Sequence, residues 1–385
     1  MKVQCLQENL NRGLSLVNKA VNPLSSVTST HDILLTADGS FLKLTGTDIE
    51  MAITYPVNAK VEEKGSVALN ALRLVELVNS LPSDLITITK SKKGENVTIA
   101  CGRTTINMNG AKASSFPKAP EVAGEPIIMK LETFRQSIDW IAFAAADLYI
   151  RPILTAVAFQ FSGDEVDIAA SDTFRLAVYK AKLEGAVEEN VEINIPVKTL
   201  NRLPRLLSEQ EMGVVGIIID ESKSHVRFEL ENIEVTSQLL QGRFPPYPKA
   251  VPHNYTTRVV AETNSLLNAV KSTAPLASRS AYTIRLKTKP GEIAFSARAE
   301  SVGDSFCTVS ALVEGEEERV ALDARYLADV LEALRQSHIE KTAIELFGTS
   351  SPVIIHPVGE ENYLHMIMPM IIADWDVLEQ AEEGQ

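Results

Sequence analysis

The sequence predicts an α+β fold built from three diverged copies of one unit, each of about 125–130 residues. Three observations support this prediction. Apolar and polar residues alternate in many short runs rich in β-branched side chains, which is typical of strands with one buried face. Six other segments repeat their apolar residues at intervals of three or four, the pattern of an amphipathic helix. Landmarks in the chain also recur at one long interval, which indicates a duplicated domain rather than a solenoid unit.

The strand-like runs are bounded by Gly, Asp, Asn and Pro, which favour turns. The clearest runs are residues 85–89, 97–99, 166–169, 226–230, 293–295 and 353–355. The helical segments, in chain order, carry Leu6, Leu10, Leu14 and Val17; Leu72, Val75, Leu77 and Val78; Leu131, Phe134, Ile138 and Ile141; Leu200, Leu203, Leu206 and Leu207; Leu266, Leu267 and Val270; and Tyr326, Leu327, Val330, Leu331 and Leu334. Each repeat thus contains two helices, expected to pack on antiparallel sheet.

The repeat is read from matching landmarks. Residues 68–73 correspond to 196–200 at a shift of 128, and to 321–326 a further 125 residues on. Residues 45–48 correspond to 169–172 at a shift of 124, and residues 115–120 correspond to 246–252 at a shift of 131. Residues 106–108 correspond to 235–237 and to 363–365. Pro-rich stretches at 116–126 and 244–252 read as crossings between domains, because Pro ends strands and stiffens links. We therefore expect domains at 1–122, 123–252 and 253–372, followed by an acidic tail, 373–385.

Composition excludes several classes of protein. The apolar share of 45% and charged share of 23% are those of an ordinary globular chain. A net charge of −13 argues against a protein that coats nucleic acid on an open face. Three scattered cysteines form neither a disulfide framework nor a zinc motif, and no signal peptide or apolar span of membrane length is present. We expect a cytoplasmic protein with no membrane partner.

No nucleotide-binding, zinc-protease or nucleophile-elbow motif occurs, so neither a cofactor nor a catalytic residue is expected. His365 near Met366, Met368 and Met370 is one arrangement that a soft metal could use, but alternation along a strand explains the spacing better, and no metal site is predicted. Asp48 beside Glu50 favours a turn over a catalytic pair. Two alternatives stay open: a hydrolase on a duplicated α+β scaffold, and a repeated surface protein, which would require a secretion signal.

Several motifs together carry a resemblance to a known family. They are residues 35–39 (LTADG), 44–51 (LTGTDIEM), 170–178 (ASDTFRLAV), 242–247 (GRFPPY) and 368–370 (MPM). Occurring in this order on a threefold repeat, they resemble the bacterial sliding clamp, the β subunit of the replicative DNA polymerase, over roughly residues 1–372. The resemblance implies a processivity factor without catalysis, which tethers the polymerase catalytic subunit and other proteins with a clamp-binding motif to duplex DNA and is placed there by a clamp loader.

The resemblance also implies a head-to-tail homodimer that closes a ring of six similar domains around DNA of any sequence. Twelve helices of about 10 Å width would line a circle of about 120 Å. That circle leaves a hole of about 28 Å once the helix radii are removed, enough for a duplex with water around it.

Residue roles follow from the same resemblance. The partner-peptide pocket maps onto Leu154, Ser171, Thr173, Phe174, Arg175, Leu176, Pro245, Lys249, Ser351, Met366, Ile367, Met368, Pro369 and Met370. Candidate DNA-facing residues on the helices are Arg12, Lys19, Arg135, Lys198, Arg202, Arg205 and Lys271. The dimer contact maps onto Arg73 and Ile106 on one side and Pro275 and Leu276 on the other. Phosphate contacts of this kind position a protein without reading sequence.

The sequence departs from the family pattern at three places. The usual Gly-His of the second-domain motif is Thr173-Phe174 here, which makes that wall of the pocket bulkier. A basic loop of the first domain is replaced by residues 23–29, which contain no arginine. The family commonly ends just after the Met-Pro-Met motif, whereas here Ile371, Ile372 and the acidic tail follow. The first and last of these changes are expected to alter how partners reach the pocket.

Overall fold

The computed structural model describes residues 1–147, 151–203, 213–299 and 301–372. The chain divides into two compact units. The first comprises Met1–Glu132 and Lys198–Leu240, and the second comprises Thr133–Val197 and the chain from Gln241 onward. All the strand pairs described below are antiparallel, as the alternating sequence pattern predicts. Within the described part of the chain, no helix is long and apolar enough to cross a membrane.

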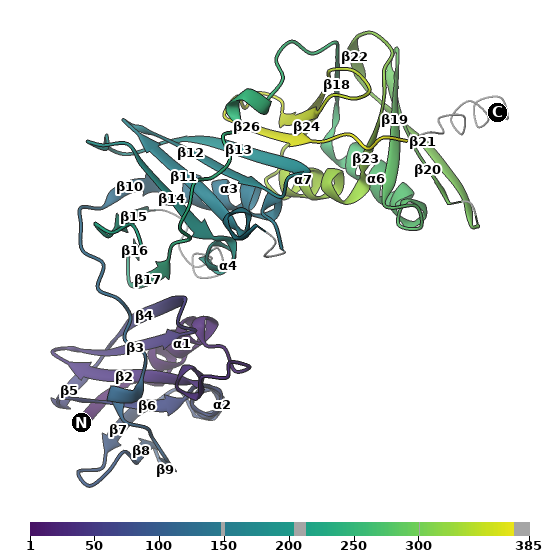
Figure 1. Cartoon of the computed structure of the whole chain (residues 1–385). Coiled ribbons are helices and arrows are strands. Elements are labelled where there is room, and N and C mark those ends of the chain that lie inside the picture. Colours follow the sequence, from purple (N-terminus) through teal and green to yellow (C-terminus); the bar gives the residue numbers. More distant parts are fainter. Residues whose placement is uncertain (148–150, 204–212, 300, 373–385) are drawn as a thin grey trace. The chain divides into compact units, whose positions relative to one another are not determined.

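The first unit contains two sheets (Figure 1). The larger has eight strands in the order β10 (Ile127–Lys130), β15 (Val214–Ile219), β16 (His225–Leu230), β17 (Ile233–Gln238), β4 (Met51–Asn58), β3 (Phe41–Thr47), β2 (Asp32–Asp38) and β6 (Gly65–Asn70). The smaller has five in the order β5 (Lys60–Glu63), β1 (Lys2–Leu6), β7 (Leu85–Lys90), β8 (Val97–Cys101) and β9 (Thr104–Met108). Helix α1 (Gln7–Val17) packs on β3 and β4 and beside α2 (Ala71–Ser80).

The second unit also contains two sheets (Figure 1). The larger has nine strands in the order β14 (Val191–Pro196), β11 (Ala156–Ser162), β12 (Glu165–Ser171), β13 (Arg175–Lys182), β26 (Tyr363–Ile367), β25 (Val353–Pro357), β24 (Lys341–Leu346), β18 (Thr257–Glu262) and β22 (Leu312–Gly315). The smaller has four in the order β21 (Gly303–Ser310), β20 (Glu292–Ala299), β19 (Thr283–Lys289) and β23 (Arg319–Asp323). Helix α6 (Thr263–Ala277) packs on β20 and β21 and beside α7 (Ala324–Gln336).

The predicted helices are present, with differences at Leu6 and Leu72. Leu6, which the spacing predicts on the first helix, instead ends strand β1 and is 53% exposed, because the chain turns into the helix only at Gln7. Leu10, Leu14 and Val17 are fully buried on α1, as their spacing predicts. On α2, the predicted Val78 is buried, Val75 and Leu77 are half-buried, and Leu72 is 55% exposed; Ala71 and Leu74 complete the buried face. The fourth helical segment begins as α4 (Val197–Leu200), and its predicted apolar residues Leu206 and Leu207 lie outside the described residues. The third segment is α3 (Leu131–Ile141).

Within each unit, one sheet continues from one predicted repeat into the next. In the first unit, β17 pairs with β4, which places Val235 opposite Ile53. In the second, β26 pairs with β13, which places Met366 opposite Leu176. The strands β17 and β26 contain the landmarks 235–237 and 363–365, which the repeat makes equivalent to each other and to part of β9. Successive repeats are therefore joined by backbone hydrogen bonds at equivalent strands.

Candidate peptide-binding pocket

A buried apolar cluster lies where the second predicted repeat meets the third. It joins residues of β11, β12, β13 and β26 with the short helical turn before β11 and the segment that follows β17. Its members are Leu154, Ala158, Ala169, Leu176, Val178, Phe244, Tyr247 and Met366. The rings of Phe244 and Tyr247 meet edge to face at 6.4 Å. Burial raises the pKa of the Tyr247 hydroxyl, so this group stays neutral. This packed cluster forms the apolar floor of the pocket described below.

A strained turn connects β12 to β13 at the edge of this cluster. Thr173 has a φ of 83°, a conformation that a β-branched residue rarely adopts. Side chains on either side hold it: the Asp172 carboxylate accepts from the backbone N–H groups of Phe174 and Arg175, and the Ser171 hydroxyl donates to the Arg175 carbonyl at 2.7 Å. These bonds explain how the turn persists although its φ is one that glycine adopts more readily than threonine.

The first unit contains the same turn at the equivalent place. Ile49 also has a φ of 83°, the Asp48 carboxylate accepts from the Met51 N–H at 2.9 Å, and the Thr47 hydroxyl donates to the Met51 carbonyl. The prediction that Asp48 serves a turn is confirmed. Since an aspartate and a hydroxyl residue recur at both junctions, the duplicated sequence landmark corresponds to a duplicated backbone geometry.

Replacing Thr173 with Gly is expected to stabilise the protein by about 0.5–1 kcal/mol, because a left-handed β-branched residue costs about 1–2 kcal/mol and the entropy of glycine offsets part of this. The gain would appear as a higher midpoint of urea unfolding. Thr173→Ala is the control, since alanine keeps the Cβ that the turn disfavours. A lower midpoint for Thr173→Gly than for the unchanged protein would contradict the strain.

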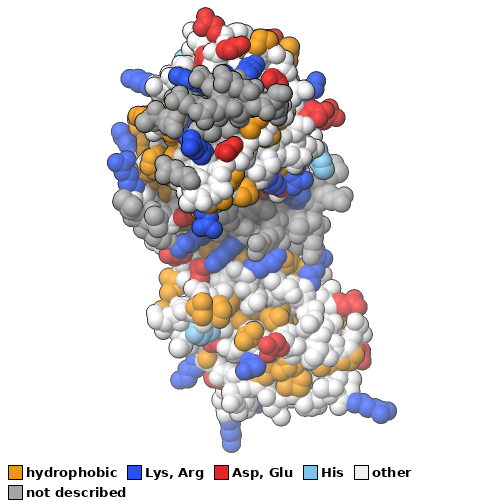
Figure 2. Space-filling view, turned by 90° about the vertical axis from the view of Figure 1, so that its right-hand side faces the viewer, with side chains coloured by type: hydrophobic (Ala, Val, Ile, Leu, Met, Phe, Trp, Pro, Cys, Tyr) orange, Lys and Arg blue, Asp and Glu red, His pale blue; other side chains and the backbone are white. Residues whose placement is uncertain are grey.

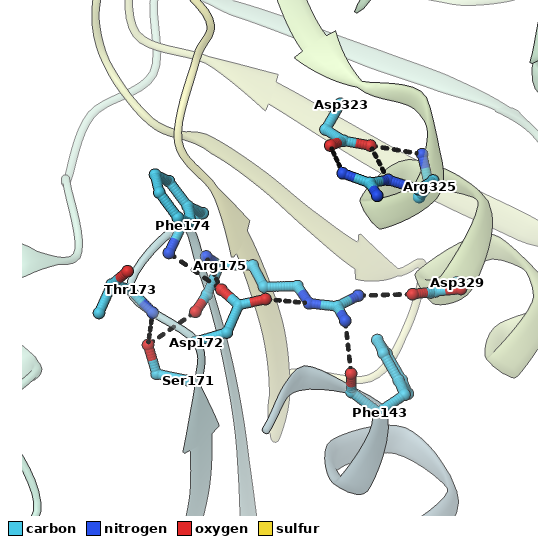
Figure 3. A network of polar contacts seen from close by, with 9 residues as sticks. All are labelled: Phe143, Ser171, Asp172, Thr173, Phe174, Arg175, Asp323, Arg325 and Asp329. Carbon is cyan, nitrogen blue, oxygen red and sulfur yellow. Dashed lines mark hydrogen bonds and ion pairs between the residues drawn. The ribbon is translucent and has the colours of Figure 1, made fainter. Parts of the chain in front are cut away.

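Arg175 is the centre of a polar network beside the turn (Figure 3). Its side chain is about 10% exposed. The guanidinium donates to Asp172 at 3.0 Å, to Asp329 of α7 at 2.6 Å and to the Phe143 carbonyl at 2.6 Å. It also lies over the Tyr326 ring, 4.4 Å from the centroid. Arg175 therefore joins β13 to α7, and its charge is fully engaged inside the protein.

A pocket of about 960 Å³ opens in front of this network. Its lining comprises Ala145, Ala146, Asp147, Arg151, Leu154, Asp172, Thr173, Phe174, Arg175, Arg325, Tyr326 and Asp329. Phe174 remains 60% exposed at its rim. Arg325 is paired with Asp323 and stacks over Tyr282 at 3.8 Å, so the far wall is also held in place. The arrangement suits an extended ligand with apolar side chains and a polar backbone.

The chain that follows β26 passes along the pocket. The N–H of Met368 donates to the Phe174 carbonyl at 2.8 Å, and the N–H of Met370 donates to the Ala321 carbonyl at 2.7 Å. The Met368 side chain is 40% exposed, so a flexible thioether borders the site. The segment is thus tied to both the turn and β23.

His365, on the strand before this segment, is completely buried. Neither of its ring nitrogens has a hydrogen-bond partner, and its ring lies 5.4 Å from that of Phe143. Burial lowers the pKa of His365 to about 3, with the Arg175 charge adding to the effect. Its place on β26 agrees with the strand alternation expected from the sequence. Among the described residues, no three His, Cys, Asp or Glu side chains are placed to share a metal ion.

Six of the fourteen predicted pocket residues lie at the pocket or in the cluster beneath it. Leu154, Thr173, Phe174 and Arg175 line the pocket, while Leu176 and Met366 belong to the apolar cluster beneath it. The other predicted residues have these positions: Ser171 in the turn, Pro245 and Lys249 beside Phe244 and Tyr247, Ile367 buried opposite Arg175, Pro369 and Met370 after Met368, and Ser351 in the turn before β25.

Sequence reasoning missed the wall supplied by α7, namely Arg325, Tyr326 and Asp329, as well as Arg151. The helical pattern identified the buried face of α7, but no local signal shows what its polar side faces. Asp172 lies within a quoted motif, and its role became visible only with its hydrogen bonds.

The candidate DNA-facing residues have varied surroundings. Arg12 and Lys198 are exposed, whereas Lys19 and Arg135 are half-buried. Arg202 contacts the Asp48 carboxylate at 2.6 Å, and Lys271 contacts Glu332 of α7 at 2.8 Å. Arg205 lies outside the described residues. Arg202 and Lys271 therefore already have acidic neighbours, and Asp139 lies close enough to Arg135 to be affected by its charge.

The candidate dimer residues lie at the surface of their units. Arg73 is exposed on α2, 3.3 Å from Glu76. Ile106 is half-buried on β9, an edge strand of the five-stranded sheet. Pro275 is exposed and Leu276 half-buried in the last turn of α6.

Comparison with known proteins agrees with this architecture. Three family models match in succession: the N-terminal domain of the DNA polymerase III beta subunit over residues 1–120, its central domain over 128–246 and its C-terminal domain over 248–371. A protein named "Beta sliding clamp" from Synechocystis is 28% identical, with 96% of this chain and 99% of that protein covered. A Staphylococcus aureus protein of the same name is 27% identical, covering 91% and 94%.

Solved structures give the same result. The DNA polymerase sliding clamp of Bacillus subtilis superimposes with a TM-score of 0.91 at 25% identity, over 97% of this chain and 100% of that one. The DNA polymerase III subunit beta of Pseudomonas aeruginosa gives 0.89 at 26% identity, over the same shares.

The chain therefore belongs to the DNA polymerase III beta subunit family, the bacterial sliding clamps. This membership confirms the family and the α+β fold class predicted from the sequence. It also confirms the prediction of a processivity subunit that is not itself an enzyme. The hydrolase alternative finds no support in these matches.

Proposed function

We propose that two copies of this chain close head to tail into a ring that encircles duplex DNA and tethers its partners there. Each copy would contribute three domains, 1–122, 123–252 and 253–372. The ring would act in the cytoplasm, would be placed on DNA by an ATP-driven clamp loader, and would hold DNA of any sequence by encirclement rather than by adhesion.

The observation that best supports a closed ring is that the first and third repeats each have a sheet that ends in an edge strand. At each junction inside the chain, a strand of the later repeat pairs with the earlier repeat, as β17 does with β4 and β26 with β13. The equivalent strand of the first repeat is β9, which lies at the edge of the five-stranded sheet. In the third repeat, β21 lies at the edge of the four-stranded sheet. Pairing β9 of one copy with β21 of another would extend the same joint between chains.

Charge supports encirclement rather than adhesion. The net charge is −13, and on the face seen in Figure 2 Lys and Arg side chains are scattered, with Asp and Glu among them. A ring holds DNA by topology and needs little net attraction, and few phosphate contacts have to break as it slides. Arg12, Lys19, Arg135, Lys198, Arg202, Arg205 and Lys271 are the residues we propose to face the duplex.

The pocket in front of Arg175 is the proposed docking site for partners: the polymerase catalytic subunit, the clamp loader and other proteins with a clamp-binding motif. Its apolar floor, the exposed ring of Phe174 and the adaptable Met368 suit short peptides with apolar anchors. Phe174, in place of the usual histidine, would favour apolar over polar contacts at this wall.

Substituting Ile106 with Asp is expected to prevent dimerisation, because a charge would enter the apolar centre of the proposed joint. Light scattering after size exclusion should give twice the 42.1 kDa of one chain for the unchanged protein and a single-chain mass for the variant. Leu24→Asp, at a position 93% exposed in the same unit, is the control and should remain dimeric. A single-chain mass for the unchanged protein would count against the ring.

Retention on circular DNA tests the encirclement itself. After loading, the protein should stay on a closed circle through washing at high salt and should be lost when a nuclease cuts the circle once. Binding by adhesion predicts equal retention on both forms. That result would overturn the proposed function.

A further inference from the structure

We propose that the acidic tail, residues 373–385, binds the pocket of its own chain and competes there with partner peptides. The inference rests on the proposed function of the pocket and adds a regulator to it. The tail lies outside the described residues, so the argument uses the point where it starts, the surface around that point and the tail sequence.

The tail starts next to the pocket. Met368 is bonded through its N–H to the carbonyl of Phe174, which lines the pocket rim. Ile372, the last described residue, follows four residues later and thus lies within about 14 Å of Met368, at 3.3–3.6 Å per residue. Six further extended residues, 373–378, span about 20 Å, enough to return to the pocket. The tail can therefore reach the pocket without any movement of the folded chain.

The exposed apolar surface at this place matches apolar residues in the tail. Phe174 is 60% exposed, Met368 40% and Ile371 97%. The first half of the tail contains Trp375, Val377 and Leu378. A tryptophan and a leucine three residues apart are suitable anchors for an apolar cleft, and the polar backbone between them stays free to form hydrogen bonds.

The charges are also complementary. Arg151 lines the pocket, and Arg243 and Lys249 flank Phe244 and Tyr247 of the cluster beneath it; all three are exposed. None of the three forms an ion pair with another described residue, whereas Asp172 and Asp329 are both engaged by Arg175. Asp147 is the remaining acidic residue of the lining. The tail carries Asp374, Asp376, Glu379, Glu382 and Glu383 and no basic residue.

A tether of this length gives the tail a local concentration in the millimolar range. If the isolated tail bound with a Kd of about 0.1 mM, the attached tail would weaken competing peptides by about tenfold. Partners with stronger anchors would displace the tail, and weaker ones would be excluded. The tail would thus raise the affinity that a partner needs in order to use the ring.

Trp375 reports on docking in the full chain. The second tryptophan, Trp140, is fully buried, so subtracting the emission of a Trp375→Phe variant isolates the signal of Trp375. We expect a difference spectrum with blue-shifted emission that iodide quenches poorly, and that shifts red in high salt. A difference spectrum typical of tryptophan in water would overturn the proposal. Docking that disappears on dilution would assign the tail to a second copy and would also overturn it.

A binding experiment gives a second, independent answer. The probe is a synthetic, fluorescently labelled peptide of residues 373–385, followed by anisotropy. The full-length double variant Trp375→Ala/Leu378→Ala should bind it about tenfold more tightly than the unchanged protein, because its own tail no longer competes. Gln380→Ala is the matched control and should bind like the unchanged protein. Equal affinities, or no binding to the double variant, would overturn the proposal.

The experiments distinguish a failure of the tail proposal from a failure of the proposed function of the ring. Retention on circular DNA does not depend on the pocket, so a protein that passes that test and fails the two tail experiments is a clamp without this regulator. A protein released equally from circular and linear DNA would instead lose the proposed function itself.

Discussion

Replacing Arg175 with Ala is expected to destabilise the second unit by about 3 kcal/mol. Removing one partner of a buried ion pair costs about 3–5 kcal/mol, because the remaining charge is left without compensation. Here the change would strand the Asp172 carboxylate, 14% exposed, together with the Phe143 carbonyl. Asp329 is 44% exposed and can recover water, which places the expected loss at the lower end of the range.

The measurement is urea unfolding followed by the emission of the buried Trp140, which lies in the same unit. Lys182→Ala is the control: Lys182 is 68% exposed and pairs with Asp164 and Glu165, and an exposed pair contributes at most about 1 kcal/mol. Arg175→Lys should lie between the two, since a compact ammonium cannot match the planar spread of guanidinium donors that reaches Asp172, Asp329 and the Phe143 carbonyl. A loss of stability no larger than that of the control would show that the contacts of Arg175 between β13 and α7 do not stabilise the unit.

The second large effect concerns acid and His365. In the unfolded chain this imidazole takes up a proton below about pH 6.5, whereas burial delays protonation of the native state until about pH 3. The unfolded state therefore binds more protons between these values, so stability is complete above pH 6.5 and falls as the pH drops below it. At pH 5 the loss is about 2 kcal/mol.

His365→Leu should remove this acid-dependent loss. It should also raise stability at pH 7.5 by about 1–3 kcal/mol, since the native ring buries polar nitrogens without partners. Urea midpoints measured from pH 7.5 to pH 5 give both quantities. His253→Gln, at an exposed position, is the control substitution. If the variant and the unchanged protein lose stability in parallel below pH 6.5, another group causes the acid response.

How far the sequence predicts this protein depends on whether a feature is local. Strand and helix positions follow from periodicity, because each element buries one face. The buried face of α2 was misjudged since five leucines and valines, among them Leu72, compete for it, and only tertiary packing decides between them. The pocket wall carried by β13 and Met368 came from a family resemblance, and periodicity alone would not have identified it.

The part of the pocket that the sequence did not predict was missed for a physical reason. Asp329 reaches Arg175 from 154 residues further along the chain, and Tyr326 stacks on it from the same helix. A single sequence contains no record of such a pairing, because the α7 pattern reflects only contacts with its own core. The left-handed turn at Thr173 is hidden for a similar reason: threonine normally argues against that conformation, and only its hydrogen bonds explain it.

In each of the two equivalent turns, some positions fix the backbone and a neighbouring position is free to change during evolution. The backbone geometry depends on Asp48 and Asp172 and on the hydroxyls of Thr47 and Ser171, so these positions tolerate little variation. The neighbouring position carries an exposed side chain in each copy, Glu50 in the first and Phe174 in the second. The same loop thus displays a carboxylate at one junction and a benzyl group at the other. Recognition at this surface can diversify through one side chain while the inherited scaffold stays unchanged.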